Sequence, residues 1–283
     1  MVGGPLTPKF PEEISGTGHQ GAAPVREIVM LEQVLSTGVF AFLLVFARVG
    51  SAAMLLPGFG EAYVPPRVRL MVALVLAFVL TPPVAAVLPP LPDSPTRLLL
   101  VLGGEIVVGL FIGTAARLIL VGLQTAGMII AFEINLANAL VNDPATAQQG
   151  SIAGNLFMAL GVVLIFATDL HHFLLRGLLD SYGTFLPGAL PQAGDMADMM
   201  TRVVSASFTL AVQIAAPFIL VGLIFNLGIG LIARLMPQIQ IFFVAMPLQI
   251  LLGLMVLMLS LSVGMMWFLD RFEVTMSGLF GAR

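Results

Sequence analysis

The sequence has no cysteine, a single lysine and few charges of either sign. Without cysteine the chain has no disulfide, no thiolate nucleophile and no thiolate-bound metal. The one lysine, Lys9, lies close to the N-terminus, so a P-loop lysine, a Schiff-base lysine and a Ser–Lys dyad are excluded from the rest of the chain. The net charge of −3 is scattered and leaves no basic face for a nucleic acid.

Apolar residues, in contrast, are abundant. Hydrophobic residues make up 59% of the chain, charged residues 10%, and the mean hydropathy is +1.05. A soluble domain is typically about 45–50% apolar and about 25% charged. So few charges do not cover the surface of a water-soluble protein of this size. The composition therefore predicts an all-α, polytopic membrane protein.

The two ends of the chain differ from its body. Residues 1–29 are rich in Gly, Pro, Ser, Thr and charges and hold no apolar run, so we expect a disordered N-terminal tail. Met30 offers an alternative translation start, which would make this tail an artefact. Residues 30–275 are expected to form a single helical domain, and residues 276–283 a short C-terminal tail.

Charges and Pro/Gly clusters divide the body into six apolar elements. Their approximate bounds are 34–56, 68–88, 96–134, 151–168, 203–233 and 235–269. The element 96–134 is too long for one perpendicular span, so it either bends or projects beyond the membrane. The pair Pro82-Pro83 should kink or split the second element. Segment 135–150 reads as a polar loop, and residues 171–186 as an interfacial amphipathic helix.

One charged residue, Arg234, lies alone between Arg202 and Asp270. An arginine at the centre of an inserted helix costs about 2.5–3.5 kcal/mol. Pro237 and Pro247 should prevent a continuous helix through this zone. We therefore expect the last two apolar elements to form a helical hairpin with Arg234, Pro237 and Gln238 at its tip, where free carbonyls at a helix end favour the guanidinium.

Four further charges lie within apolar sequence: Arg48, Glu105, Arg117 and Glu133. Glu105 and Arg117 are about 18 Å apart along one helix, so they do not pair with each other. Their partners are expected on other helices or other chains, and structural pairing is favoured over proton or ion relay. Gly109 and Gly113 form a small-xxx-small pair, which predicts a close helix–helix contact.

Polar side chains give two further hypotheses. Uncharged amides in apolar sequence should face protein or water, either as interhelical contacts, which we favour, or as the lining of a conduit; they are Gln124, Gln213, Asn226, Gln238, Gln240 and Gln249. Asp169, His171 and His172 are the nearest candidate metal ligands. Adjacent helical residues point about 100° apart, so we expect no metal site here. We also expect no cofactor and no catalysis, since no nucleophile–base arrangement is present.

The hairpin region carries the most specific motif. Arg234-x-x-Pro237-Gln238-x-x-x-Phe242, followed by Pro247 and Gly253, resembles the FliR family of flagellar biosynthetic proteins, export-gate subunits of type III secretion that include SctT-like counterparts in virulence systems. Further matching residues occur in family order: Arg48, Pro57, Phe59, Pro65, Arg69, Glu105, Gly109, Gly113, Gln124, Gly127, Asp143, Pro144, Ser181 and Pro187. Leu170 departs from the family, which commonly has glycine before the histidine.

The resemblance implies a non-enzymatic subunit of a mixed-subunit helical pore built from helical hairpins partly above the bilayer plane. Its implied partners are FliP- and FliQ-type subunits, FlhB- and FlhA-type proteins, and unfolded flagellar export substrates. The implied location is the bacterial inner (cytoplasmic) membrane, within the flagellar basal body. The family's loop corresponding to 135–148 lies inside the channel and helps to plug it; here its residues include Asn135, Leu136, Asn138, Leu140, Val141, Asn142, Asp143 and Pro144.

Two alternatives stay open beside the flagellar export gate. The first is an export-gate subunit of a virulence-type secretion system. The second is a secondary transporter that uses Arg48, Glu105, Arg117 and Glu133 as coupling groups. A transporter of that kind predicts an internal repeat, and the sequence has none of fixed period.

Overall fold

The computed structural model describes residues 22–136, 152–189, 192–235 and 241–280. These residues form seven α-helices and no strand, which confirms the all-α prediction. The helices are α1 (Ala22–Ala53), α2 (Pro66–Val84), α3 (Pro95–Glu133), α4 (Ile152–Ala167), α5 (Leu170–Thr184), α6 (Ala193–Leu235) and α7 (Ile241–Phe280). The chain divides into two units, residues 1–40 and residues 41–283, and the sites described below lie within the second.

Within the part of the chain that the structure describes, four helices are long and apolar enough to cross a membrane: α2, α3, α6 and the part of α7 from Ala245 to Phe280. The pair α4 and α5 adds a fifth candidate span if the two count as one broken helix, since they meet at a bend of 76°. This number of apolar helices is that of a polytopic membrane protein.

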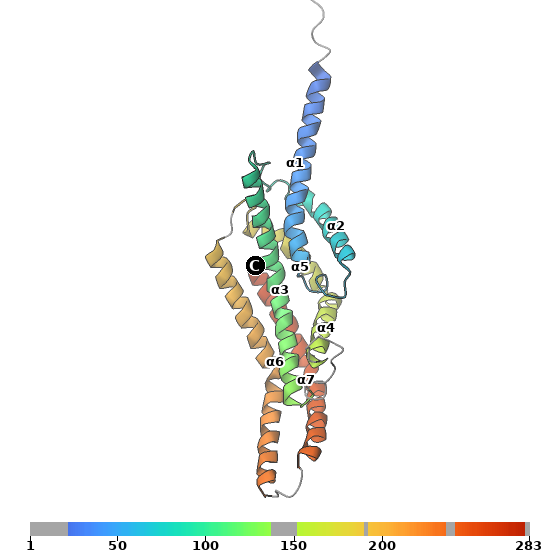
Figure 1. The fold of residues 1–283 in the computed structure, drawn as a ribbon, viewed down its shortest axis with the longest axis vertical. Coiled ribbons are helices and arrows are strands. Elements are labelled where there is room, and N and C mark those ends of the chain that lie inside the picture. The colour runs from blue at the N-terminus through green and yellow to red at the C-terminus, as the bar shows by residue number, and fades with distance from the viewer. Residues whose placement is uncertain (1–21, 137–151, 190–191, 236–240, 281–283) are drawn as a thin grey trace, which may run out of the picture. The chain divides into compact units, whose positions relative to one another are not determined.

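Helix α3 forms the centre of the second unit. It packs against α6 and α4 along much of its length and also contacts α7 (Figure 1). Its start is fixed by Ser94, whose side chain accepts a hydrogen bond from the backbone N–H of Arg97, and by Pro95 in the first turn. Its 39 residues span about 58 Å. The expectation that this element exceeds one perpendicular span is confirmed.

The proline pair of α2 ends the helix instead of splitting it. Pro82 and Pro83 lie in the last turn, and the helix stops at Val84, four residues before the expected end at Leu88. Each proline removes a donor for a carbonyl one turn earlier, and here those carbonyls belong to the final turns of the helix. The Thr81 hydroxyl, just before the two prolines, donates to the carbonyl of Ala77.

Both ends of the helical body reach further than the sequence predicts. Helix α1 begins at Ala22, within the segment expected as a tail; Pro24 stands in its first turn, where proline is tolerated, and helix-forming residues follow. Helix α7 continues to Phe280, beyond the expected boundary at 275. The reason is packing, because Met276 and Phe280 are buried in the main core.

The polar stretch after α4 is more helical than expected. Helix α5 occupies Leu170–Thr184, close to the amphipathic helix predicted at 171–186. It buries one stripe at helical spacing: Leu174, Gly177, Leu178, Ser181 and Tyr182. Helix α6 begins at Ala193, ten residues before the predicted apolar start at Val203, because polar residues such as Asp195 extend its first turns.

Candidate functional site

A buried polar cluster joins α1, α3 and the end of α5. Arg48 is fully buried, and its Nε and Nη2 donate to the two carboxylate oxygens of Glu105 at 2.7 Å and 3.2 Å. Its Nη1 donates to the Ser181 hydroxyl at 3.2 Å, and Nη2 also donates to the carbonyl of Phe185 at 2.9 Å. The guanidinium carbon lies 3.9 Å from the centre of the Tyr182 ring. The bidentate ion pair joins α1 to α3, and the hydrogen bond to Ser181 joins α1 to α5.

Glycines on α3 allow α1 to approach closely. A Cβ placed on Gly109 would overlap the carbonyl oxygen of Arg48 and the hydroxyl of Ser51. A Cβ on Gly113 would lie 2.8 Å from the carbonyl oxygen of Ala52. The small-xxx-small pair therefore lies at the contact with the helix that carries Arg48. Close backbone approach places Arg48 within reach of Glu105, one turn before Gly109 on α3.

A second polar cluster holds the C-terminal end of α3. Gln249 of α7, which is buried, donates from its side-chain amide to the carbonyl of Glu133 at 2.5 Å. Its amide oxygen accepts from the side chain of Asn135 at 2.6 Å. Asn135 has a positive φ of 57°, which asparagine tolerates better than most residues, and this turns the chain away from the helix axis. These two hydrogen bonds hold the end of α3 against α7.

Two glycines make room for this junction. A Cβ on Gly253 of α7 would overlap the side chain of Ile134, and one on Gly222 of α6 would overlap the carboxylate of Glu133. Gly253, predicted as part of the hairpin motif, therefore contacts the end of α3 and not the tip of the hairpin.

The last two helices form the predicted hairpin and extend beyond α3 (Figure 1). Helix α6 continues from Gly222 to Leu235, which is about 20 Å past the end of α3. Arg234 is exposed and lies in the last turn of α6, where a cation is favoured by the helix dipole. Pro237 and Gln238 lie outside the described residues, as does the side chain of Phe242 in the first turns of α7.

Pro247 does not interrupt α7, so the prediction that it would bar a continuous helix is wrong. It is the seventh residue of the helix, and it is exposed. Helix α6 likewise contains Pro217. Interior prolines are tolerated in apolar helices because neighbouring groups and small local adjustments satisfy the freed carbonyl.

The remaining two predicted charges are half-buried. Arg117 donates from Nη1 to the carbonyl of Gly60 at 3.4 Å, in the connection between α1 and α2. Glu133 lies beside Gly222 and lines a small cavity between α3, α6 and α7. Within the described residues neither forms an ion pair. Of the four charges predicted within apolar sequence, Arg48 and Glu105 are the two that the structure pairs.

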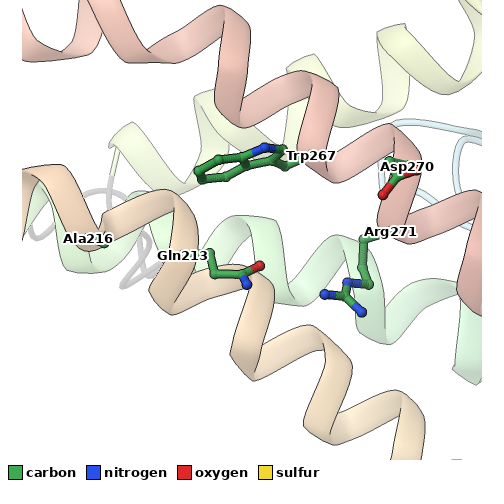
Figure 2. Close-up of a pocket in the computed structure, with 5 residues that line it drawn as sticks. All are labelled: Gln213, Ala216, Trp267, Asp270 and Arg271. Atoms are coloured by element: carbon green, nitrogen blue, oxygen red, sulfur yellow. The ribbon is translucent and has the colours of Figure 1, made fainter.

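A hollow of about 360 Å³ lies between α6 and α7. Figure 2 shows Trp267, Asp270 and Arg271 of α7 facing Gln213 and Ala216 of α6. Trp267 is about half exposed and Asp270 is exposed. The hollow has too little apolar enclosure to resemble the pockets that bury small-molecule ligands.

Comparison with known proteins assigns the chain to a family. The model of the family described as Bacterial export proteins, family 1, matches residues 39–275. The chain belongs to this family. It is 40% identical over 240 residues to flagellar biosynthetic protein FliR of Caulobacter vibrioides, covering 83% of this chain and 94% of that relative. It is 30% identical over 226 residues to the protein of the same name from Bacillus subtilis, covering 79% and 86%.

A relative of a different name is Yop proteins translocation protein T of Yersinia pestis. It is 29% identical to the chain over 157 residues, covering 54% of this chain and 59% of that relative. The span matched by the export-protein family includes the Arg48 cluster, the Gln249 junction and the hairpin.

Of the predicted plug residues only the first two are described. Asn135 is bound to Gln249, and Leu136 is half-buried against the main core. The others, namely Asn138, Leu140, Val141, Asn142, Asp143 and Pro144, lie outside the described residues.

Sequence reasoning missed two contributors to these clusters. Tyr182 and the carbonyl of Phe185 complete the surroundings of Arg48. The spacing of the apolar stripe on α5 contained the signal, because Ser181 and Tyr182 continue the pattern of Leu174 and Leu178. That pattern identifies the buried face but not the helix that it contacts.

Proposed function

We propose that the chain is a subunit of the bacterial flagellar type III protein export gate, forming part of the channel through which unfolded flagellar proteins leave the cell. The observation that carries this proposal is the 40% identity to a flagellar biosynthetic protein over 94% of its length. Several apolar helices and membership of an export-protein family make the chain a membrane component of an export apparatus. The location within the inner membrane and the flagellar basal body is part of the proposal.

The surface of the hairpin supports assembly with other subunits. Large apolar side chains on both helices are strongly exposed in the isolated chain, including Met258 at 83%, Leu259 at 82% and Leu235 at 74%. An apolar surface of this kind is covered by lipid or by protein. We propose that FliP- and FliQ-type subunits cover it in a shared helical pore, and that FlhB- and FlhA-type proteins contact the assembly.

The buried charges favour a structural role over solute coupling. Arg48 is 0% exposed and Glu105 is 2% exposed, and the guanidinium contacts protein groups on every side described above. A coupling group in a transporter needs access to water or substrate during its cycle. We propose that the chain is a passive conduit and gate, without catalysis of its own.

The virulence-type alternative has weaker support. The relative from Yersinia pestis matches 54% of this chain, whereas the flagellar relative from Caulobacter vibrioides matches 83% with higher identity. Deletion of the gene distinguishes the two, because loss of flagella is expected for the flagellar gate. Cells that remain fully motile after deletion would contradict the flagellar assignment.

The plug proposal is tested on segment 136–141. Replacing these six residues by glycine removes the apolar side chains of Leu136, Leu140 and Val141. We expect a rise in small-ion leak across the cell membrane, measured in cells that express the variant together with its partner subunits. The control is the same replacement by glycine in residues 186–189, which belong to the connection after α5. An unchanged leak in the 136–141 variant would contradict the plug role.

A further inference from the structure

The start of helix α5 gathers two histidines and an aspartate beside the bend that follows α4. One possible ligand atom from each of Asp169, His171 and His172 lies within 4.8 Å of the other two. Imidazole nitrogen and carboxylate oxygen are among the usual ligands of Zn²⁺. We propose that these three side chains bind a divalent transition-metal ion of the zinc type, with water completing its coordination.

The convergence of the two histidines contradicts the expectation that adjacent helical residues diverge. Their ring centres are 4.1 Å apart. Both residues lie in the first turn of α5, where Cα–Cβ bonds tilt toward the helix N-terminus. Asp169 precedes them with a φ of 59°, a left-handed conformation that turns the chain between the two helices. The three side chains consequently lean toward the same point.

The distances fit a metal site that closes with small side-chain rotations. Zinc–ligand bonds of about 2.0–2.2 Å place two ligands of a tetrahedral ion about 3.4 Å apart. The Nδ1 of His172 already lies 3.5 Å from the Oδ1 of Asp169. All three ligand atoms lie within 4.8 Å of one another, so a shift of about 1.4 Å by the exposed side chains of Asp169 and His172 brings them to the required separation, which is within ordinary rotamer freedom.

His171 carries the second observation that points to a ligand. Its Nδ1 is buried and has no hydrogen-bond partner among the described residues. Its ring is held by stacking on Phe166, with ring centres 4.8 Å apart and planes inclined by 21°. Buried polar nitrogens in proteins nearly always have a partner. A rigidly held imidazole with an unused nitrogen is suited to metal ligation, since its orientation is fixed before the ion arrives.

The site is open to solvent on its other side. The side chains of Asp169 and His172 are 81% and 64% exposed. An ion therefore has a direct path of entry, and water fills the positions that the three side chains leave vacant. Binding would tie the bend residue Asp169 to the first turn of α5 and so restrain the 76° angle between α4 and α5.

The experiment measures metal binding directly. The full-length chain, purified in detergent with a tag that contains no histidine, is titrated with Co²⁺, whose visible absorption reports coordination, and Zn²⁺ retained after gel filtration is then quantified. We expect stoichiometric retention of Zn²⁺ by the native chain. His172→Ala and Asp169→Asn should each weaken Co²⁺ binding by about tenfold or more, because each removes one of three ligands.

The matched control is Asp180→Asn, which removes an exposed carboxylate of α5 outside the cluster. It should bind Co²⁺ as the native chain does. Because His172 is exposed, its replacement by alanine should not unfold the chain. Circular dichroism of each variant checks that the helices remain. Absence of Co²⁺ binding by the native chain, or unchanged affinity in His172→Ala, would overturn the proposal. Either result leaves the export function untouched, since neither measurement involves secretion.

Discussion

Arg48 and Glu105, 57 positions apart in the sequence, form a two-point ion pair that is closed to solvent on every described side. Removal of one partner leaves a buried charge without compensation, which typically costs about 3–5 kcal/mol. We therefore expect Glu105→Ala to lower the free energy of unfolding by an amount in this range and to reduce the level of the chain in membranes. Thermal unfolding in detergent and quantitative immunoblotting measure the two effects.

The double variant Arg48→Met, Glu105→Leu separates loss of a partner from loss of the pair. Replacing both charges by apolar side chains of similar volume is often close to neutral. It should therefore be more stable than Glu105→Ala alone. A double variant as unstable as the single one would show that the hydrogen bonds from Arg48 to Ser181 and Phe185 matter more than the charge pair.

The close contact between α3 and α1 predicts unequal effects of two glycine substitutions on the same helix. Gly109→Ala places a methyl group against the carbonyl oxygen of Arg48, whereas Gly104→Ala meets no atom within 4 Å. Overpacking typically costs about 1–3 kcal/mol, while alanine is favoured over glycine in a helix by up to about 1 kcal/mol. Gly109→Ala should lower the melting temperature and Gly104→Ala should preserve or raise it. Equal melting temperatures would contradict the contact.

The junction at the end of α3 depends on the Gln249 amide. Gln249→Leu keeps the volume but leaves the carbonyl of Glu133 and the amide of Asn135 without this partner. Unsatisfied buried groups cost about 1–3 kcal/mol. We expect a loss of stability in this range, measured by thermal unfolding. Gln213→Leu, an exposed amide on α6, is the control and should change little. A Gln249→Leu protein as stable as the control would rule out the junction.

The hairpin tip should matter for assembly more than for folding of the chain. Arg234 lies in the last turn of α6, and a cation at a helix C-terminus typically contributes about 0.3–1 kcal/mol. Arg234→Ala and Pro237→Leu should therefore leave the chain folded but reduce swimming in soft agar and the recovery of partner subunits on copurification. Arg176→Ala, an exposed arginine on α5, is the control. Normal motility in both tip variants would show that this account of the tip is wrong.

Local sequence signals predicted the helices well and their partners poorly. The apolar runs and the proline clusters place α3, α4 and the break between α6 and α7 close to their observed bounds. Burial of Arg48 was expected, yet its pairing with Glu105 depends on which helices pack together. Helix packing depends on residues far apart in the sequence. Glycines of α3 allow α1 to approach closely, and the buried stripe of α5 provides Ser181 as a hydrogen-bond partner of Arg48.

The errors have a common physical origin. Pro247 was expected to break a helix on intrinsic preference, but an apolar environment leaves the backbone no better alternative than a helix. Phe280 was assigned to a tail, because nothing local shows that it packs beside Gly177. The convergence of His171 and His172 reflects helix-end geometry, which the ideal angle of 100° per residue does not represent.

The length of α6 beyond α3 has a consequence for biogenesis. Two helices alone cannot shield their own apolar flanks, so the arm from Gly222 onward is left without a finished environment when the chain first inserts. A newly inserted copy therefore keeps these apolar side chains in lipid unless other protein covers them.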